Sequence, residues 1–385
     1  MRQTIVWTLA LALVVTAVPA MATWEEGVAA FTKKDYQTAA SHFQELVDQN
    51  PDGYRGHYML GLSLQQMGQR ESAMSHLRKA YDLNPNDLSI KLALGRAYKN
   101  LRRYGEVAQL LSSVDASSLP AAQQAAFYQM RGEARFKTGD EGSAVQDFQQ
   151  LARLQPNNAQ VQYLYGTTAL SQGQTDAGID ALDKANRLDP SNGDVTRAYA
   201  QALIKKGRLT RDKTAKRTAY LRAADLAKTL VSQADNFDNN MLLISAELGA
   251  GQYGAAVATG QKCVAKNGSD WLAHYYLGQA YSSNGQYTEA EAPLLAAKER
   301  ASASDLNLVW SMLGFIYEKQ KKYTQSIAAY QSAGDSAGVA RVQDNERTAR
   351  ENEQIEAENA RIREMEEEAR KLEEELQALE GGGGR

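Results

Sequence analysis

The chain has 385 residues, 43% of them hydrophobic, which is enough apolar material for a large core and excludes disorder over most of its length. The formal net charge is −3, but residues 341–380 hold 14 acidic and 7 basic side chains, so the negative charge is concentrated there. No dominant basic field remains elsewhere, and nucleic acid is therefore not an implied partner.

Residues 1–22 have the pattern of an export signal. Arg2 gives a small positive end, residues 5–18 are almost wholly apolar, and an A-x-A cleavage site ends at Ala22. The apolar run is shorter than the roughly 20 residues that span a bilayer as a helix. We expect cleavage after Ala22 and a mature protein in the bacterial periplasm or another extracytoplasmic space. The alternative is that the segment is retained as an anchor.

Small and turn-forming residues recur at a fixed interval along the chain. Gly27, Gly61 and Gly95 are 34 residues apart, and the same interval separates Pro51 from Pro85. Further pairs at this interval are Gly132 and Gly166, Pro156 and Pro190, and Gly251 and Gly285. A period in this range indicates a solenoid of stacked units.

Each period is predicted to contain two helices, because its apolar residues follow helical spacing in two stretches. In one unit the first stretch ends near Met67 and the second begins near Ala73. A glycine between the two stretches is expected to take the left-handed conformation that ends a helix. These turn glycines are Gly68, Gly139, Gly173 and Gly285. After the second helix a proline such as Pro85 stops the helix, and Asp87 caps the next one.

These residues resemble the tetratricopeptide repeat family. Its pattern places an aromatic residue, a Leu-Gly pair and a tyrosine on the first helix, and Ala, an aromatic residue, Ala and Pro on the second. The best copy holds Trp310, Leu313, Gly314, Tyr317, Tyr323, Tyr330 and Ala333. The resemblance covers residues 23–338 and implies an all-α fold, a right-handed superhelical solenoid of about nine helical hairpins. Glycine and alanine at the facing positions allow two backbones to approach closely.

Two units depart from this pattern. In the third unit Val107 and Leu111 replace the expected residues and Pro120 arrives late, so its second helix is predicted to be shortened or shifted. Extra residues are inserted near residues 208–235, and this insertion is rich in basic side chains. It is a candidate for binding acidic partners or anionic lipid headgroups, and the alternative is the solvated side of a long helix. The candidate patch is Lys213, Lys216 and Arg217, within a wider basic run of Lys205, Lys206, Arg208, Arg211 and Arg222.

Residues 339–380 are predicted to form a charged helix. Ile355, Ile362, Ala369 and Leu376 recur every seven residues, and Met365, Leu372 and Leu379 stand three places after the last three of them. This apolar seam favours a coiled coil, through which copies of the chain would form a homo-oligomer. The alternative is a single solvated helix that caps the solenoid, since Glu358 and Ala369 weaken the seam. Residues 381–385 are expected to be a flexible glycine-rich end.

The sequence predicts no catalytic, cofactor-binding or metal-binding residues. Residues 249–254 fit G-x-G-x-x-G by letter, but no strand precedes them and their glycines fall on a repeat turn. The four histidines are far apart in the sequence, so we expect them to pack or face solvent rather than bind metal. Cys263 is the only cysteine and is expected to be a free buried thiol, with a bridge to another chain as the alternative.

The resemblance implies that the first helices line a concave groove that holds peptides. The matching face here presents aromatic and long polar side chains, which suit a peptide or a partner helix. The candidate partner-binding residues are Tyr58, Arg96, Lys99, Asn100, Glu133, Tyr163, Arg197, Gln201, Lys205, Tyr275 and Gln279.

We therefore expect a non-catalytic protein–protein interaction scaffold that assembles envelope proteins. The alternative function is that of an accessory subunit of an exopolysaccharide synthesis or export complex, or of a secretion complex. An enzyme with an unrecognised site is the third hypothesis.

Overall fold

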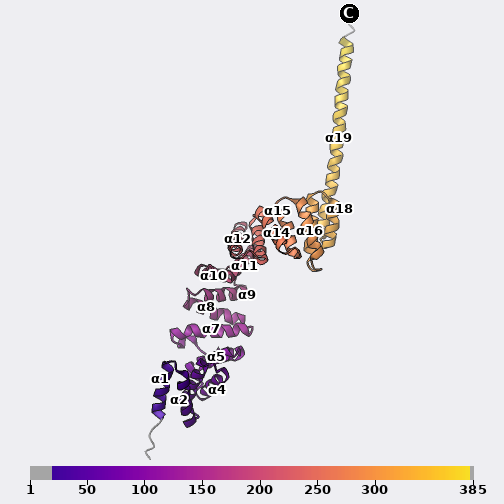
Figure 1. Cartoon of the computed structure of the whole chain (residues 1–385). Helices are drawn as coiled ribbons and strands as arrows, with labels where there is room; N and C mark the ends of the chain where they lie inside the picture. The colour runs from indigo at the N-terminus through magenta and orange to yellow at the C-terminus, as the bar shows by residue number, and fades with distance from the viewer. Residues whose placement is uncertain (1–19, 382–385) are drawn as a thin grey trace, which may run out of the picture. The chain divides into compact units, whose positions relative to one another are not determined.

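The computed structural model describes residues 20–381, and this part of the chain is helical throughout, without strands. It divides into two compact units, Met1–Asp189 (unit 1) and Pro190–Arg385 (unit 2). The predicted all-α class is confirmed, and the helices pair into nine hairpins, from α1/α2 to α17/α18, before a final single helix (Figure 1). No helix within residues 20–381 is both long and apolar enough to cross a membrane. The predicted export signal falls mostly, and the predicted glycine-rich end almost wholly, outside the described residues.

Unit 1 is a stack of five hairpins with one short 3₁₀ turn, η1 (Ala116–Ser118). Its helices are α1 (Ala20–Thr32), α2 (Tyr36–Gln49), α3 (Tyr54–Gln66), α4 (Arg70–Leu83), α5 (Leu88–Asn100), α6 (Tyr104–Ser112), α7 (Ala121–Lys137), α8 (Glu141–Leu154), α9 (Ala159–Ser171) and α10 (Thr175–Leu188). Within the unit each helix packs against the helices before and after it in the chain.

Unit 2 holds four hairpins and the last helix. Its helices are α11 (Gly193–Leu209), α12 (Lys213–Gln233), α13 (Phe237–Ala250), α14 (Tyr253–Lys266), α15 (Trp271–Ser283), α16 (Tyr287–Arg300), α17 (Leu306–Lys319), α18 (Tyr323–Ala333) and α19 (Ser336–Gly381). Odd-numbered helices also contact one another here, as α13 contacts both α11 and α15, so they form one continuous layer. That layer carries the candidate site described below.

Close packing within hairpins follows from the recurring glycine on the first helix. A Cβ atom added at Gly61 would lie 2.7 Å from the Cγ atom of Leu77, and one added at Gly278 would lie 2.5 Å from the Cγ atom of Leu294. Real Cβ atoms do not approach other atoms so closely, so the two backbones can meet only where no side chain intervenes. Leu77 and Leu294 are wholly buried at these contacts. The predicted reason for the Leu-Gly pairs is therefore confirmed.

The turn between the helices of a hairpin uses a left-handed residue. The predicted turn glycines all have positive φ, from 74° at Gly173 to 86° at Gly139. Three hairpins place a side-chain-bearing residue in the same conformation, at Lys34, Arg102 and Lys321. Since an L-residue is strained there, these three turns are less favourable than the glycine turns.

The irregular units differ from the others in helix length. The second helix of the third hairpin, α6, has 9 residues against the 14 of α4, so the predicted shortening is confirmed. The insertion near residues 208–235 lengthens helices instead of forming a loop, because α11 has 17 residues and α12 has 21. The side chain of Asp212 caps α12 by accepting a hydrogen bond from the backbone amide of Ala215.

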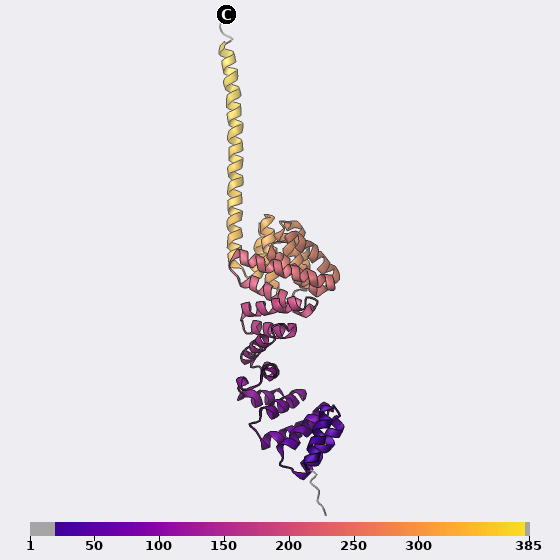
Figure 2. The same cartoon turned by 90° about the vertical axis from the view of Figure 1, so that its left-hand side faces the viewer.

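The last helix, α19, has 46 residues and packs mainly on α18, with polar contacts to Glu318 of α17 (Figures 1 and 2). Val342 is wholly buried, and the Arg341 guanidinium lies 3.0 Å from a carboxylate oxygen of Glu318. From Glu351 to Gln377 every residue is exposed. The helix is thus anchored at its first turns and solvated along the rest of its length.

Candidate functional site: two grooves lined by the first helices

A groove in unit 1 brings together three of the predicted partner-binding residues. Tyr58 on α3 and Arg96 and Lys99 on α5 line a cavity of about 440 Å³. Its remaining lining residues are Ser89, Leu92, Gln123, Ala126, Gln129 and Met130. Lys99 is engaged within the chain, because its Nζ atom lies 2.6 Å from a carboxylate oxygen of Glu133. Arg96 is exposed and is the cation of this groove that remains open to a ligand.

A longer groove runs through unit 2 and is made of three cavities that share lining residues. The first, of about 760 Å³, and the second, of about 560 Å³, share Arg208, Ser245 and Tyr276. The second and the third, of about 500 Å³, share Tyr275, Gln279 and Ser283. We call the three together the unit 2 groove; it passes over α11, α13, α15 and α17 in order.

One end of the unit 2 groove is basic. Its cations are Arg197, Lys205 and Arg208 on α11 and Lys216 on α12. Asp238 and Asp270 line the same end, and Asp270 is already engaged because it accepts a hydrogen bond from the amide of Ala273 as the cap of α15. The insertion is what brings Lys216 to the groove, since it extends α12 beside the end of α11. A net positive lining of this kind attracts carboxylates.

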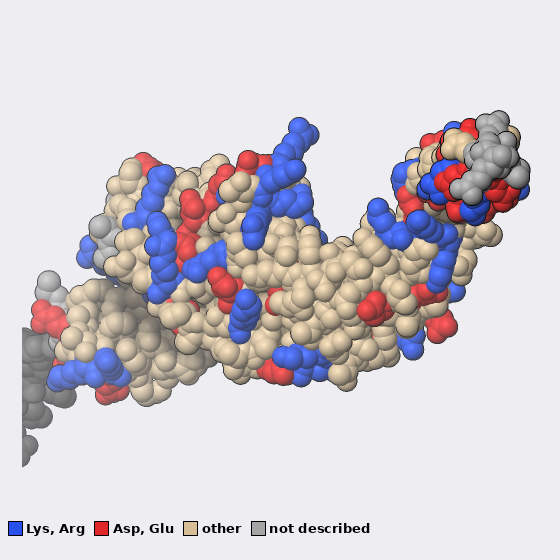
Figure 3. All heavy atoms as spheres, turned by 90° about the horizontal axis from the view of Figure 1, so that it is seen from above, with Lys and Arg blue, Asp and Glu red and all other residues tan. Residues whose placement is uncertain are grey.

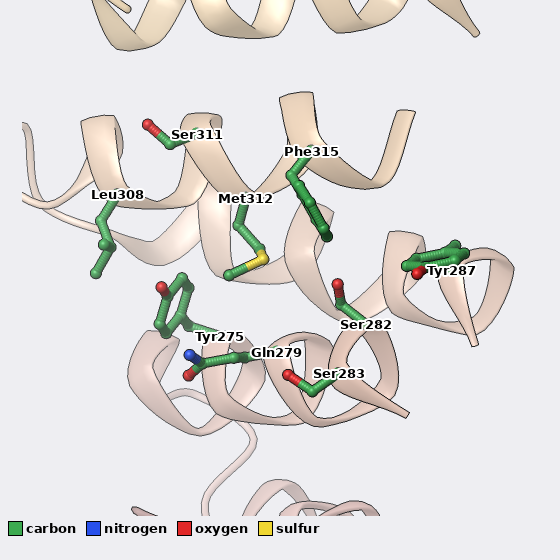
Figure 4. A pocket seen from close by; sticks show the side chains of 9 residues that line it. All are labelled: Tyr275, Gln279, Ser282, Ser283, Tyr287, Leu308, Ser311, Met312 and Phe315. Atoms are coloured by element: carbon green, nitrogen blue, oxygen red, sulfur yellow. The ribbon is translucent and has the colours of Figure 1, made fainter. Parts of the chain in front are cut away.

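The other end of the unit 2 groove is apolar and aromatic. Leu308, Met312 and Phe315 come from one face of α17 and point toward Tyr275, Gln279 and Ser283 on α15, with Tyr287 at the side (Figure 4). Leu308 is 49% exposed and Phe315 is 37% exposed, so both can be covered further. No Lys, Arg, Asp or Glu lines this cavity. Such a surface suits apolar side chains of a ligand.

Burial raises the pKa values of two tyrosines that line the grooves, Tyr275 and Tyr58. It raises the pKa of Tyr275 to about 12, with the neighbouring Tyr276 as a second cause. Burial also raises the pKa of Tyr58, with the charge of Asp87 adding to the effect. Both phenols therefore stay protonated at neutral pH and serve as hydrogen-bond donors with an apolar ring, which is typical of contact residues.

Five candidate residues lie outside the cavities, and one of them is Glu133, which pairs with Lys99. Asn100 is exposed at the end of α5, and Tyr163 is half-buried on α9, and neither lines the cavities described here. Lys213 and Arg217 are exposed on α12 beside Lys216, but only Lys216 reaches the groove. The candidates that line the unit 2 groove are Arg197, Gln201, Lys205, Tyr275 and Gln279, and their role in binding stays a prediction.

The apolar end on α17 was missed from the sequence. Phe315 directly follows Gly314, just as Gln279 directly follows Gly278, so the repeat register alone marks it as a groove position. Met312 and Leu308 lie one and two turns before Phe315 on the same helix face. The register that marks Gln279 as a groove residue in one repeat marks Phe315 in the next repeat, so the sequence already contained the information needed to find it.

The histidines are not all apart from one another, because His57 Nδ1 lies 3.0 Å from His76 Nδ1, and two of the four contact the backbone at turns between hairpins. His57 Nε2 lies 2.9 Å from the carbonyl oxygen of Pro51, and His274 Nε2 lies 2.9 Å from that of Gly268. Gln162 bonds the carbonyl oxygen of Pro156 from the corresponding place in another unit. These polar side chains satisfy the backbone at the turn between hairpins. Among the described residues, no group of three or more His, Cys, Asp or Glu side chains is placed to hold a metal ion.

Two of the glycines in residues 249–254, Gly249 and Gly251, have structural roles. Gly251 ends α13 with a φ of 76°, and a Cβ atom at Gly249 would lie 2.2 Å from the ring of Tyr220. Turn formation accounts for Gly251, and close packing accounts for Gly249. Cys263 is wholly buried, and burial raises the pKa of its thiol to about 12.

Comparison with known families agrees with the stacked hairpins. One tetratricopeptide repeat pattern matches residues 8–54, 130–192, 166–225 and 241–305, and a second matches residues 54–87 and 309–333. The chain belongs to the tetratricopeptide repeat (TPR) family. The matches include residues of every hairpin of the described chain except the third, α5/α6, and α19 follows the last hairpin.

Solved structures of TPR proteins resemble parts of the chain. YrrB, described as a TPR protein with an unusual peptide-binding site, is 15% identical over 54% of this chain and 99% of its own, with a TM-score of 0.45. MamA from Desulfovibrio magneticus is 19% identical over 46% of this chain and 93% of its own, with a TM-score of 0.39. A TPR protein from Parabacteroides merdae is 11% identical over 75% and 96%, with a TM-score of 0.40. No curated protein matches the chain.

Proposed function

We propose that this TPR protein is a non-catalytic scaffold that binds polypeptide segments of other proteins along the unit 2 groove. The observation that carries the proposal is the overlap of three cavities into one groove across four consecutive first helices. A folded substrate or a small metabolite needs no such length, whereas an extended or helical segment contacts several repeats at once. Membership in the TPR family supports the same reading.

The two ends of the groove differ in their lining residues, so a bound segment has one preferred orientation. Carboxylates of the bound segment meet Arg197, Lys205, Arg208 and Lys216 at one end, and its apolar side chains meet Leu308 and Phe315 at the other. The cations steer the encounter and the apolar end supplies buried area. The groove thereby selects segments that carry acid at one end and apolar side chains at the other.

The cellular setting belongs to the same proposal. Because residues 1–22 have the pattern of an export signal, we place the mature protein in the periplasm or another extracytoplasmic space, with envelope proteins as partners. An accessory role in an exopolysaccharide or secretion complex is the alternative. N-terminal sequencing of the mature protein decides the first point, since an intact Met1 contradicts cleavage.

The test of the scaffold function is affinity capture from the native host with matched variants. Lys205→Glu/Arg208→Glu reverses two groove charges, and Lys184→Glu/Arg153→Glu makes the same change on exposed second helices outside the groove. We expect the wild type and the second variant to retain the same proteins and the first variant to lose them. Equal retention by all three contradicts binding in the groove.

The captured proteins separate the two settings. One defined synthase or secretion complex supports the accessory role, and diverse envelope clients support a general scaffold. If Lys205→Glu/Arg208→Glu retains the captured proteins but loses binding to anionic vesicles, the basic end of the groove binds lipid headgroups instead.

Self-association through α19 remains a prediction from its apolar seam. A measured mass of one chain at micromolar concentration removes it, and a mass of two or more supports it.

A further inference from the structure

The exposed helix α19 carries an apolar seam without a partner. Ile355, Ile362, Met365, Leu372 and Leu376 are between 41% and 61% exposed. They recur at the first and fourth positions of a seven-residue repeat, which lie on one face of a helix. A helix that is solvated on every side gains nothing from such a stripe, so the stripe indicates a partner helix.

The charges of α19 are sorted by heptad position. Acidic residues flank the seam on both sides in its C-terminal half; they are Glu366, Glu368, Glu373, Glu375 and Glu380. Glu366, Glu368, Glu373 and Glu375 are exposed and form no ion pair with any described residue. The seam is therefore bordered by carboxylates that the chain itself leaves uncompensated.

The basic residues of this half lie on the outer face instead. Lys371 Nζ is 3.3 Å from a carboxylate oxygen of Glu367, and Arg370 Nε is 3.9 Å from one of Glu374. These pairs link residues four apart and stabilise the helix itself. Figure 3, which looks along α19 from its C-terminal end, shows both kinds of charge around the helix. The cations are thus engaged away from the seam.

This arrangement disfavours pairing with a second copy of the same helix. In a parallel pair, Glu368 of one copy faces Glu373 of the other, and the one attractive contact of this kind is that of Arg361 with Glu366. In an antiparallel pair Glu366 and Glu368 meet the same residues of the other copy, and Arg361 facing Glu375 is the one attractive contact. Like charges beside the seam destabilise the pair, and Ala369 in the seam contributes little buried area. Complementary flanks would need cations from another chain.

We propose that α19 is one half of a heterotypic coiled coil, whose other half is a helix of a partner protein with an apolar seam flanked by lysine or arginine. This surface is separate from the unit 2 groove and does not depend on the function proposed for the groove. The scaffold then holds two partners, one along its repeats and one along its tail.

The test uses the full chain and three fluorescein-labelled synthetic peptides of about four heptads each. The first has an Ile/Leu seam with Lys at the flanking positions, the second has the same seam with Glu there, and the third has the Lys flanks with its seam residues scrambled. We expect fluorescence anisotropy to show at least tenfold tighter binding of the first peptide than of the other two. Equal binding of the scrambled peptide overturns the proposal, because charge alone then explains the affinity.

A charge-reversed chain serves as the matched control. In Glu366→Lys/Glu368→Lys/Glu373→Lys/Glu375→Lys the preference should switch to the Glu-flanked peptide, since only the flanks have changed. Circular dichroism of this variant verifies that α19 stays helical. An unchanged preference overturns the proposal.

Analytical ultracentrifugation of the chain alone completes the test. A monomer at micromolar concentration agrees with a heterotypic partner, and a dimer that dissociates on Leu372→Ser overturns it in favour of self-association. Neither result bears on binding in the unit 2 groove, whose variants lie on other helices.

Discussion

The repeat array and the tail use the same kind of helix in two opposite ways. Leu294 in the array is wholly buried against the backbone of the preceding helix, whereas Leu372 in the tail is 61% exposed. The array buries its core of apolar residues against other helices of the same chain, so its stability does not depend on a partner. The apolar seam residues of the tail are exposed, and in our proposal a helix of another protein covers them. The comparison teaches that apolar periodicity predicts a contact without saying whether the chain supplies both sides of it.

The largest expected effect comes from the same truncation made on both sides of this comparison. Leu294→Ala should lower the free energy of unfolding by about 2–5 kcal/mol, because it opens a cavity in a close-packed hairpin. Leu372→Ala should change it by no more than about 0.5 kcal/mol, since that side chain is exposed. Urea denaturation followed by circular dichroism measures both. Equal losses would show that the tail is packed in solution.

A second test asks whether a glycine of the array is needed because a neighbouring side chain lies close to it. Gly61→Leu should destabilise unit 1 by about 1–3 kcal/mol, because the added side chain has no room beside Leu77. Gly105→Leu is the control, since a Cβ atom at Gly105 has no neighbour within 4 Å. Thermal melting of both variants should show a lower midpoint only for the first. An unchanged midpoint for Gly61→Leu contradicts the packing.

A smaller effect is expected at the strained turns. Lys321→Gly should raise the stability of unit 2 by about 0.5–1 kcal/mol, because glycine adopts the φ of 60° found there without a steric penalty. Lys262→Gly, in the interior of α14, should instead destabilise by about 1 kcal/mol. Chemical denaturation midpoints compare the two. A loss of stability at Lys321 would mean that its side chain contributes more than its backbone costs.

The smallest effect concerns a buried carboxyl in the array. Burial raises the pKa of Glu247 above its ordinary value of 4.5, while Thr259 and two lysines partly offset the shift. A group whose folded pKa is raised contributes stability below its unfolded pKa and loses it as the pH rises through the folded pKa. Glu247→Gln should therefore raise the melting midpoint at pH 8 and leave it unchanged at pH 4. Glu289→Gln, on the exposed face of α16, should have no effect at either pH.

The fold was predictable because the residues that allow close packing and turns recur at the same positions in several repeats. Each Leu-Gly pair marks a place where two backbones meet, as Gly61 and Gly278 show, and each turn glycine marks the end of a first helix. The strained turn at Lys321 was not predicted, since nothing in that residue announces a left-handed conformation. It takes the place of the turn glycine of the other copies, so only the register of the repeat reveals it.

The site was predictable in part. Tyr58, Arg96, Arg197 and Gln279 lie where the repeat register places groove residues, but the joining of three cavities depends on how successive hairpins stack. Asn100, one position beyond Lys99 at the end of its helix, does not line the cavity that Lys99 lines, and its role in binding stays a prediction. Side-chain direction at a helix end changes by about 100° per residue, so a step of one position moves a residue off the groove.

The most direct test of the account is site-specific photocrosslinking in the native host. p-Benzoylphenylalanine placed at Leu308, in the apolar end of the unit 2 groove, should crosslink to a partner polypeptide, and Lys205→Glu/Arg208→Glu should abolish that product. The same probe at the exposed Glu289, outside the groove, should give none. Crosslinks of equal yield at both positions, or a product at Leu308 that survives the charge reversal, would contradict binding along the groove.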